Sequence, residues 1–259
     1  MKLAITFLGT GTSQGIPVIG CDCEVCTSDD PRDKRLRTSA VIHLPGRNIL
    51  IDTTPDLRTA ALNVNLRQVD AIFITHTHAD HVLGLDDVRR FSQLSGEPID
   101  LYCSAEDIPR IDKVFGYGRV KEDRPFNPDI PQLRFHAVEG PFELFGHQVE
   151  PLSLPHGSRD VLSFRIGALA YCTDVSEMPE WAYERLQGLD TLILGALRPR
   201  NHPKHLTIDQ AVAVARRLSP RQSYFVHMAH QVSHATVQAT LPDGIELAYD
   251  GLCVDIEGQ

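Results

Sequence analysis

Four side chains that can bind a metal ion lie within six residues of one another. They are His76, His78, Asp80 and His81. Each ring nitrogen of a buried histidine needs a partner, so three imidazoles and a carboxylate at this spacing need a common one. A divalent cation is the partner that these two ligand types share. The spacing therefore indicates a metal site.

A buried strand must deliver these side chains. Residues 71–74 are Ala-Ile-Phe-Ile, an apolar run typical of a strand inside a sheet. The histidine segment begins where this strand stops, so its side chains lie at a sheet edge and can converge on a cavity. Three other predicted strands end in the same way at a candidate ligand: 148–154 before His156, 168–171 before Asp174 and 222–226 before His227.

The combined set contains five histidines and two aspartates. That is too many ligands for one ion, and it suits two ions that share a bridging carboxylate. All the donor atoms are nitrogen or oxygen, which fits zinc, manganese or iron without choosing among them. The sequence therefore predicts a centre with two metal ions.

Short strand and helix patterns fill the rest of the chain. The further predicted strands are residues 2–8, 40–44, 48–51, 99–103, 133–138, 142–145, 162–166, 191–194, 245–248 and 252–255. The predicted helices are residues 56–66, 83–94, 105–115, 180–186, 207–218 and 235–240. Thr207 is the expected cap of its helix, and residues 116–131 are expected to form a mobile surface loop.

Strands dominate both halves of the chain. Two sheets with helices on their outer faces fit this order better than a doubly wound parallel sheet. No repeat, linker or low-complexity segment interrupts the sequence, so residues 1–259 are expected to form a single domain.

Composition narrows the classes of function. The 259 residues are 42% hydrophobic and 23% charged, which is ordinary for a globular protein with a full core. A net charge of −9 disfavours extended nucleic acid or an anionic membrane as the main partner. The short apolar run at the N-terminus does not resemble a signal peptide, and no segment has the length of a membrane span. We expect a cytoplasmic protein that does not bind membranes.

Three of the six cysteines form a cluster, which is typical of structural zinc rather than of disulfides. The trio is Cys21, Cys23 and Cys26. Tetrahedral zinc needs a fourth ligand, and either His230 or Cys253 could supply it. The remaining Cys103 and Cys172 lie in predicted strands, where a buried thiol is ordinary.

A glycine-rich loop follows the first predicted strand at residues 9–15. Its backbone N–H groups could surround an anion, or the glycines could simply permit a tight turn. The dinucleotide-binding pattern does not apply, because Pro17 and the cysteines follow where a helix would have to begin.

Residues 75–81, Thr-His-Thr-His-Ala-Asp-His, resemble the signature of the metallo-β-lactamase superfamily, and His156, Asp174 and His227 resemble its later ligand motifs in order. The resemblance implies an α+β four-layer αββα sandwich. It also implies that His76, His78 and His156 bind one ion, that Asp80, His81 and His227 bind the other, and that Asp174 bridges them. Asp52 matches the aspartate that orients ligands by hydrogen bonding.

The chemistry implied by such a centre is hydrolysis by a hydroxide that bridges two ions. Phosphodiesters suit two ions well, because the ions can also offset charge on the substrate oxygens. A leaving alkoxide still needs a proton, and His205 is the candidate general acid. We expect Asp80 to lie near His205 and to hold it. His202 is expected at the surface.

Within the superfamily, the cysteine trio resembles that of the PhnP-type phosphodiesterases, which hydrolyse cyclic phosphates. That resemblance implies a structural zinc completed by His230, with His227 serving the catalytic pair, and active-site metals that are typically manganese, with zinc as the alternative. It implies a small phosphodiester substrate, and a homodimer is plausible.

Four alternatives differ in what they require. A tRNA 3′-processing endonuclease of this superfamily has a tRNA-binding arm between the third histidine motif and the bridging aspartate, where this chain has only seventeen residues. A thioester or lactone hydrolase of the glyoxalase type would need a helical domain after His227. A β-lactamase would need a secretory signal. A catalytically idle metal-binding protein would be expected to lack ligands.

Overall fold

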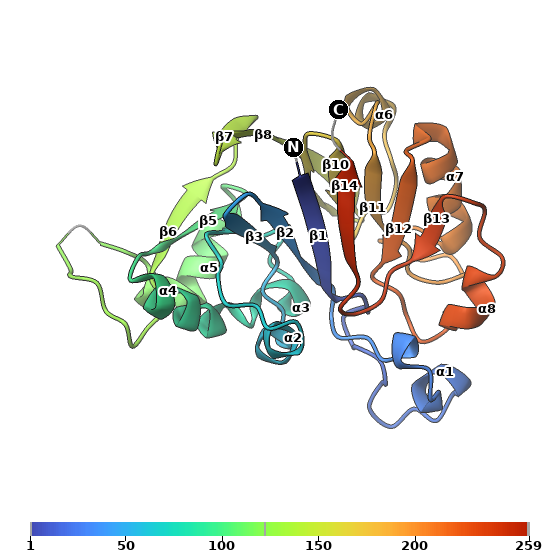
Figure 1. Cartoon of the computed structure of the whole chain (residues 1–259), viewed down its shortest axis with the longest axis horizontal. Helices are drawn as coiled ribbons and strands as arrows, with labels where there is room; N and C mark the ends of the chain where they lie inside the picture. The colour runs from blue at the N-terminus through green and yellow to red at the C-terminus, as the bar shows by residue number, and fades with distance from the viewer. Residues whose placement is uncertain (1, 122, 258–259) are drawn as a thin grey trace.

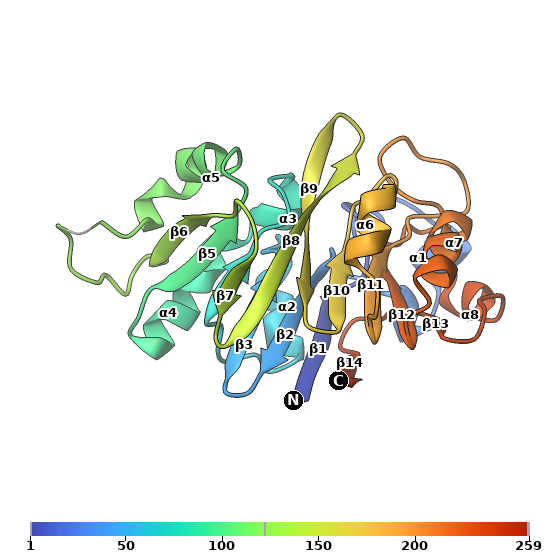
Figure 2. The same ribbon diagram turned by 90° about the horizontal axis from the view of Figure 1, so that it is seen from above.

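Two seven-stranded sheets pack face to face and carry helices on their outer faces (Figures 1 and 2). The computed structural model describes residues 2–121 and 123–257. The two ends of the chain lie side by side, because the first and last strands are neighbours in one sheet. This is the four-layer αββα sandwich that the sequence predicts.

The first sheet has the order β14-β1-β2-β3-β4-β5-β6. Its strands from β14 to β3 are antiparallel, and those from β3 to β6 are parallel. Their bounds are β1 Lys2–Gly9, β2 Ser39–Leu44, β3 Arg47–Ile51, β4 Ala71–Phe73, β5 Ile99–Cys103, β6 Leu133–Ala137 and β14 Cys253–Glu257.

The second sheet has the order β13-β12-β11-β10-β9-β8-β7. Strands β10 to β13 are parallel, whereas β7 to β10 pair antiparallel. Their bounds are β7 Phe142–Leu144, β8 His147–His156, β9 Arg159–Ile166, β10 Leu169–Cys172, β11 Thr191–Gly195, β12 Gln222–Val226 and β13 Ile245–Leu247. Two antiparallel pairings separate β8 from β10, so these strands run in the same direction and end at the same edge.

Aromatic rings fill the space between the sheets. Phe73 of β4 and Phe164 of β9 are both buried, and their ring centroids lie 4.5 Å apart. Two further apolar clusters lie under the outer helices, one with Leu57, Val88 and Ile111, the other with Ala182 and Val214. Burying each of the larger side chains contributes about 1.5–3 kcal/mol, so every helix layer is held by its own apolar face.

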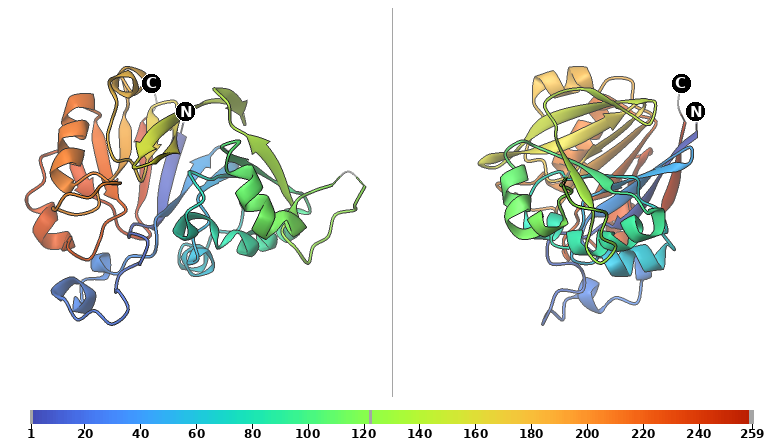
Figure 3. Two further views of the ribbon diagram at one scale, coloured as in Figure 1. Left: turned by 180° about the vertical axis from the view of Figure 1, so that it is seen from behind. Right: turned by 90° about the vertical axis from the view of Figure 1, so that its left-hand side faces the viewer.

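The helices lie on both outer faces, as the views from behind and from the side also show (Figure 3). The α-helices are α1 Glu24–Thr27, α2 Leu57–Asn63, α3 Ala79–Val82, α4 Arg89–Ser95, α5 Ile108–Phe115, α6 Glu180–Arg185, α7 Ile208–Leu218 and α8 His234–Gln238. Short 3₁₀ turns are η1 Pro31–Asp33, η2 Leu85–Val88 and η3 Gly116–Gly118. No helix in the described ranges is long and apolar enough to cross a membrane.

One predicted helix, 83–94, is divided in the structure. It consists of the 3₁₀ turn η2 followed by α4. Gly84 donates its N–H to the carbonyl of Thr53 at 2.8 Å, and a Cβ at this glycine would lie 1.9 Å from the Thr54 carbonyl oxygen. This close approach places Gly84 ahead of the first turn, so the helical segment begins at Leu85 rather than at residue 83. The apolar residues 85, 88 and 91 are spaced by three, which a 3₁₀ turn satisfies as well as an α-helix does.

The start of α5 and the beginning of the predicted loop 116–131 differ from the prediction, whereas the predicted cap of α7 is confirmed. Helix α5 begins at Ile108 rather than at 105, with Pro109 in its first turn, where the missing N–H costs nothing. The predicted loop 116–131 begins with η3, and its residue 122 lies outside the described residues. Thr207 caps α7 as predicted, in a reciprocal capping box with Gln210.

Candidate metal centre

The strand ends of both sheets bring the predicted ligands together at one edge of the sandwich. Ligand atoms within 4.8 Å of one another form four overlapping groups, which are His76–His78–His156, His76–His81–Asp174, Asp80–His81–His227 and His156–Asp174–His205. Asp174 belongs to two of these groups, so it lies between the first set of histidines and the second. The seven side chains predicted as catalytic-metal ligands are therefore all in one place.

The first group surrounds His76. Its Nε2 lies 2.7 Å from Nδ1 of His78, and the His156 ring is 5.2 Å from the His76 ring, centroid to centroid. The Nδ1 of His156 donates a hydrogen bond to the Lys204 carbonyl at 2.9 Å. That bond fixes the tautomer, so the unprotonated Nε2 faces the other two rings. This buried Nε2 has no hydrogen-bond partner among the described residues.

The second group surrounds His81. Its Nε2 lies 3.4 Å from an Asp80 oxygen and 3.5 Å from an Asp174 oxygen. The Nε2 of His227 lies 3.3 Å from the other Asp174 oxygen and 3.7 Å from Asp80. Both ring nitrogens of His227 are buried, and within the described ranges neither has a hydrogen-bond partner. Orphaned nitrogens of this kind are costly unless an additional atom binds them.

Asp52 lies behind the second group and is completely buried. One of its oxygens accepts hydrogen bonds from Nδ1 of His81 at 2.7 Å and from the Thr75 hydroxyl at 2.8 Å, and the other accepts from the Thr75 N–H at 2.8 Å. These bonds hold the His81 ring in the tautomer that presents Nε2 to the carboxylates. This is the orienting position that the sequence predicts for Asp52.

Three residues of the site have left-handed backbone conformations. The φ angles are 59° at Asp52, 60° at Asp174 and 60° at His227. Each residue follows the end of a parallel strand, and each conformation is uncommon for a residue other than glycine. Strain of this kind persists only where the surrounding structure holds it, and here it turns each side chain out of its strand toward the shared centre.

The charges of the first group and of the two carboxylates suit cation binding. Burial would lower the pKa of His81, but Asp174 and Asp52 hold it well above its usual value, so an ion there must displace a proton. Burial lowers the pKa of His76, His78 and His156, so these imidazoles are neutral near pH 7. Burial alone would raise the pKa of Asp174, but the neighbouring His227 and His81 hold it well below its usual range. Burial would also raise the pKa of Asp80, but His227 and His81, whose Nε2 atoms lie 3.7 Å and 3.4 Å from its carboxylate, hold it well below the usual range. Neutral imidazoles and ionised carboxylates are the forms that bind metal ions.

His205 lies beside the centre. Its ring stacks on His227 with centroids 4.8 Å apart, and its Nδ1 is 3.8 Å from an Asp174 oxygen. Burial, followed by the charge of His227, lowers the pKa of His205 to about 3. The sequence placed Asp80 near this histidine, but within the described ranges the carboxylate that faces it is Asp174. His202 lies further out, 5.0 Å from His205 between ring centroids.

The three clustered cysteines meet His230. Its Nδ1 is 3.3 Å from Sγ of Cys21, 3.4 Å from Sγ of Cys23 and 3.7 Å from Sγ of Cys26. The Cys26 N–H lowers the pKa of the Cys23 thiol to about 6, whereas burial raises that of Cys26 to about 11. Cys253 is exposed on β14 and is not part of this group. Of the two candidates for the fourth ligand, the structure brings His230 to the trio.

The glycine-rich loop at residues 9–15 forms a tight turn. The N–H groups of Gly11, Thr12 and Gly15 all donate to carbonyls within the protein, so they do not surround an anion. The Thr12 N–H bonds the Met228 carbonyl at 3.0 Å, and the Met228 N–H bonds the Thr10 carbonyl at 3.0 Å. The loop therefore braces the residue after His227.

Two residues beside the centre were not anticipated from the sequence. Asp107 at the start of α5 accepts a hydrogen bond from the hydroxyl of Thr77, which lies between two of the histidines, at 2.6 Å. It also accepts from Arg159, three residues after His156, at 2.9 Å. An arginine so close in sequence to a predicted ligand was a usable signal. Its partner Asp107, 52 residues away in the sequence, could not be identified from spacing.

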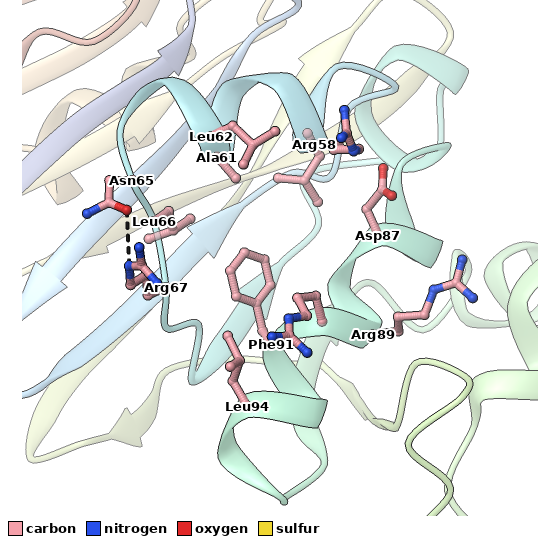
Figure 4. Close-up of a pocket in the computed structure, with 12 residues that line it drawn as sticks. Arg58, Ala61, Leu62, Asn65, Leu66, Arg67, Asp87, Arg89, Phe91 and Leu94 are labelled. Atoms are coloured by element: carbon pink, nitrogen blue, oxygen red, sulfur yellow. Dashed lines mark hydrogen bonds between the residues drawn. The ribbon is translucent and has the colours of Figure 1, made fainter.

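An apolar pocket of about 380 Å³ lies between α2 and α4 (Figure 4). Leu57, Leu66 and Phe91 line it, with several arginines around them. It shares no lining residue with the histidine groups and contains no nucleophile or cluster of ligands. The convergent histidines and carboxylates, rather than this pocket, identify the functional site.

The donor set of the site fits two divalent cations. There are two groups of imidazole and carboxylate ligands, a carboxylate between them, and buried histidine nitrogens that lack any partner in the described protein. The cysteine group offers three sulfurs and one nitrogen, the usual donor set of structural zinc.

Comparison with known proteins gives similarity over the whole chain. Residues 47–228 match the model of the β-lactamase superfamily domain. The solved structure of a diphosphatase from the PhnP family is 41% identical, with a TM-score of 0.92, over 100% of this chain and 98% of that one.

Two curated relatives are longer proteins. An octanoyltransferase from Porphyromonas gingivalis is 36% identical over 95% of this chain and 50% of its own length. A ribonuclease Z from Methanococcus maripaludis is 29% identical over 72% of this chain and 54% of its own length. The chain thus spans about half the length of these relatives.

Proposed function

Because the chain belongs to the metallo-β-lactamase superfamily and to its PhnP family, we propose that it is a dinuclear metal-dependent phosphodiesterase that acts on small phosphate esters. The observation that carries the proposal is the pair of ligand groups on either side of Asp174, with the buried, unpartnered nitrogens of His156 and His227 directed into them. Such nitrogens are expected where cations bind.

In this proposal His76, His78 and His156 bind one ion, Asp80, His81 and His227 bind the other, and Asp174 bridges the two. When bound, manganese or zinc ions lower the pKa of a water molecule and offset charge on the phosphate oxygens. The protein holds the ligands in place: Asp52 fixes the His81 tautomer, and the Lys204 carbonyl fixes that of His156.

His205 is the proposed proton donor to the leaving oxygen. It stacks on His227 and lies at the edge of the centre, near the position where a leaving group would depart. Burial keeps it neutral in the protein alone, and an anionic substrate beside it would raise its pKa and favour the protonated form.

A structural zinc is proposed at Cys21, Cys23, Cys26 and His230. His227 and His230 are three residues apart, so this zinc would fix the loop that carries a ligand of the catalytic pair. Its role is to hold the loop, and no catalysis is assigned to it.

A small substrate is favoured over transfer RNA. The seventeen residues between His156 and Asp174 form β9, β10 and their turns, which leaves no room for an inserted arm. The net charge of −9 also disfavours a polyanion. Acyl transfer, the activity in the name of the longer Porphyromonas relative, supplies a second class of substrate to test.

The direct test is metal analysis together with an activity panel. The protein is loaded with manganese or zinc and assayed on bis(p-nitrophenyl) phosphate, 2′,3′-cyclic nucleotides, ribose cyclic phosphate, a diphosphate diester, an acyl thioester and precursor tRNA. We expect cleavage of the small phosphate esters and three bound ions per chain. Cleavage of the thioester with all phosphate esters left intact would refute the proposal.

A further inference from the structure

The pocket between α2 and α4 combines apolar walls with exposed leucines. Of its lining residues, Leu57 and Phe91 are buried, whereas Leu62 is 65% exposed and Leu94 is 52% exposed. Figure 4 shows Leu62 from α2 and Phe91 and Leu94 from α4 around the same space. Apolar surface that lines a concavity and remains in water favours an apolar occupant.

Three arginines at this pocket have no carboxylate partner in the described ranges. Arg58, Arg67 and Arg90 are all exposed and are called the arginine rim below. Nε of Arg67 donates to the Asn65 side chain at 3.0 Å, and Nη1 of Arg90 donates to the Gln93 side chain at 3.2 Å. The Arg58 side chain has no partner among the described residues. Each guanidinium therefore keeps its charge and free N–H donors for a ligand.

The other charges of the lining do not cancel those of the arginine rim. Arg89 also lines the pocket, and it forms an ion pair with Asp86. Asp87 is the only acidic residue that the described chain places in the lining. The whole chain has a net charge of −9, so this cluster of positive charge contrasts with the rest of the molecule. Such a cluster attracts a ligand of the opposite sign.

The size of the pocket favours a small ligand over a protein partner. Twelve residues line it, whereas a stable protein interface takes about 20–30 residues from each side. Its volume of about 380 Å³ lies near the lower end of small-molecule pockets, which begin at about 300 Å³. An alkyl tail against the leucines, with an anionic headgroup on the arginine rim, would use both parts of this lining.

The two walls of the pocket are joined before any ligand binds. Gly84, just before η2 and α4, donates its N–H to the Thr53 carbonyl at 2.8 Å, and the Thr53 N–H donates to the His81 carbonyl at 2.8 Å. Leu57 of α2 and Val88 of η2 belong to the same buried apolar cluster. A pocket whose walls are already fixed loses less entropy when a ligand binds.

We propose that the pocket between α2 and α4 binds a single-tailed organic anion, a medium-chain carboxylate, with its headgroup on the arginine rim and its tail between Leu62, Phe91 and Leu94. None of the lining residues is a predicted metal ligand, so this site is separate from the metal centre. Failure of this proposal would leave the phosphodiesterase proposal unaffected, and the reverse also holds.

The first test is a chain-length series. Hexanoate, octanoate and decanoate are titrated into the metal-loaded protein by calorimetry, below the concentrations at which they form micelles. Excess acetate is present throughout, so that a carboxylate on the catalytic ions is competed away. We expect the affinity to rise by about fourfold with each methylene until the pocket is full, the effect of burying that group. Octylammonium, a cation with a similar tail, should bind at least about tenfold more weakly than octanoate.

The headgroup is tested by removing the arginine rim. The rim variant combines Arg58→Gln, Arg67→Gln and Arg90→Gln. The matched control has the same net charge and alters three exposed cations without a side-chain partner among the described residues, in Lys113→Gln, Arg124→Gln and Arg216→Gln. In the rim variant, octanoate should bind at least about tenfold more weakly and lose its advantage over octylammonium. The control variant should keep both the affinity and the advantage.

The tail is tested by Leu94→Asp, which places a carboxylate beside the apolar lining. We expect the gain in affinity to fall below about twofold for each methylene, because the tail no longer enters an apolar space. Val114→Asp is the control, because Val114 is 56% exposed on α5 and does not line the pocket. It should keep the chain-length dependence.

Three results would each overturn the proposal: equal binding of octanoate and octylammonium, an affinity that does not change with tail length, or equal losses in the rim variant and its control. Flotation with phosphatidylglycerol vesicles separates the pocket from a membrane-binding surface. Vesicle binding that is lost in the rim variant, without any binding of the free carboxylates, would assign the arginine rim to an anionic membrane and refute the small ligand.

Discussion

Asp52 accepts a hydrogen bond from Nδ1 of His81 over 2.7 Å, and both side chains are buried. The carboxylate fixes the tautomer in which Nε2 faces Asp80 and Asp174. Asp52→Asn keeps the shape but replaces the carboxylate acceptor with an amide. We expect the affinity for the second ion to fall by about 10–100-fold, which can be measured as metal content after dialysis against graded chelator.

The matched control for this change is Asp70→Asn. Asp70 accepts a hydrogen bond from Arg47 at 2.7 Å, away from the histidines. Its variant should retain two catalytic ions under the same dialysis. Equal retention in Asp52→Asn would show that the hydrogen bond to His81 has no part in metal binding.

Cys23→Ser tests the cysteine group. A hydroxyl is a poor zinc ligand, so we expect the variant to lose about one zinc ion per chain while the catalytic pair remains. The melting temperature should fall, because the apolar cluster that packs the loop from Cys21 to Cys26, around Ile16 and Val25, is small. Metal content by mass spectrometry and thermal unfolding measure both effects.

Cys253→Ser is the control for this prediction, because Cys253 is exposed on β14. We expect its metal content to match that of the unaltered protein. Loss of zinc from Cys253→Ser would contradict the assignment of His230 as the fourth ligand, and no loss from Cys23→Ser would contradict the zinc site itself.

His234 should make stability depend on pH. Burial lowers its pKa from 6.5 to about 4, and its Nδ1 has no hydrogen-bond partner among the described residues. The unfolded chain therefore takes up a proton at higher pH than the folded one. Above pH 6.5 this histidine is neutral in both states and costs no stability. As the pH falls toward 4, the free energy of unfolding decreases by about 3 kcal/mol at most, because the unfolded chain binds this proton first.

The measurement is the free energy of unfolding by urea between pH 7.5 and 4.5, with zinc at a fixed concentration. In His234→Gln the decrease over this range should be smaller, because that side chain does not titrate. Parallel curves for the two proteins would contradict the prediction, whatever their absolute stabilities.

Much of the fold and of the centre was predictable because strand ends are local signals. His76, Asp174 and His227 each follow an apolar run of a few residues, and parallel strands in one sheet must end at the same edge. The left-handed backbone that turns Asp174 and His227 toward the centre was not predicted, because Asp and His adopt it more often than most non-glycine residues but still only rarely.

The relationships that were missed are long-range. The bond between Asp107 and Arg159 joins α5 to β9 across 52 residues, and no local pattern predicts such a pair. The late start of the predicted helix 83–94 depends on Gly84 lying against Thr54, which periodicity cannot reveal. The approach of Asp174 to His205 was also not predicted, because the relative positions of Asp80 and Asp174 depend on how the two sheets pack.

His205→Gln separates proton donation from metal binding. The side chain is half-buried against His227 and Asp174, and glutamine keeps much of its volume without a titrating group. An alkoxide leaving group needs a proton in the transition state, whereas p-nitrophenolate is stable as an anion. We therefore expect the variant to lose about 10²–10⁴-fold in kcat on a 2′,3′-cyclic nucleotide and far less on bis(p-nitrophenyl) phosphate.

His202→Gln is the control, because His202 lies in the same loop but further from the centre. It should change neither rate by more than about twofold, since surface substitutions away from a site have small effects. Equal losses on both substrates in His205→Gln, with two catalytic ions still bound, would assign His205 to substrate binding and exclude it as the general acid.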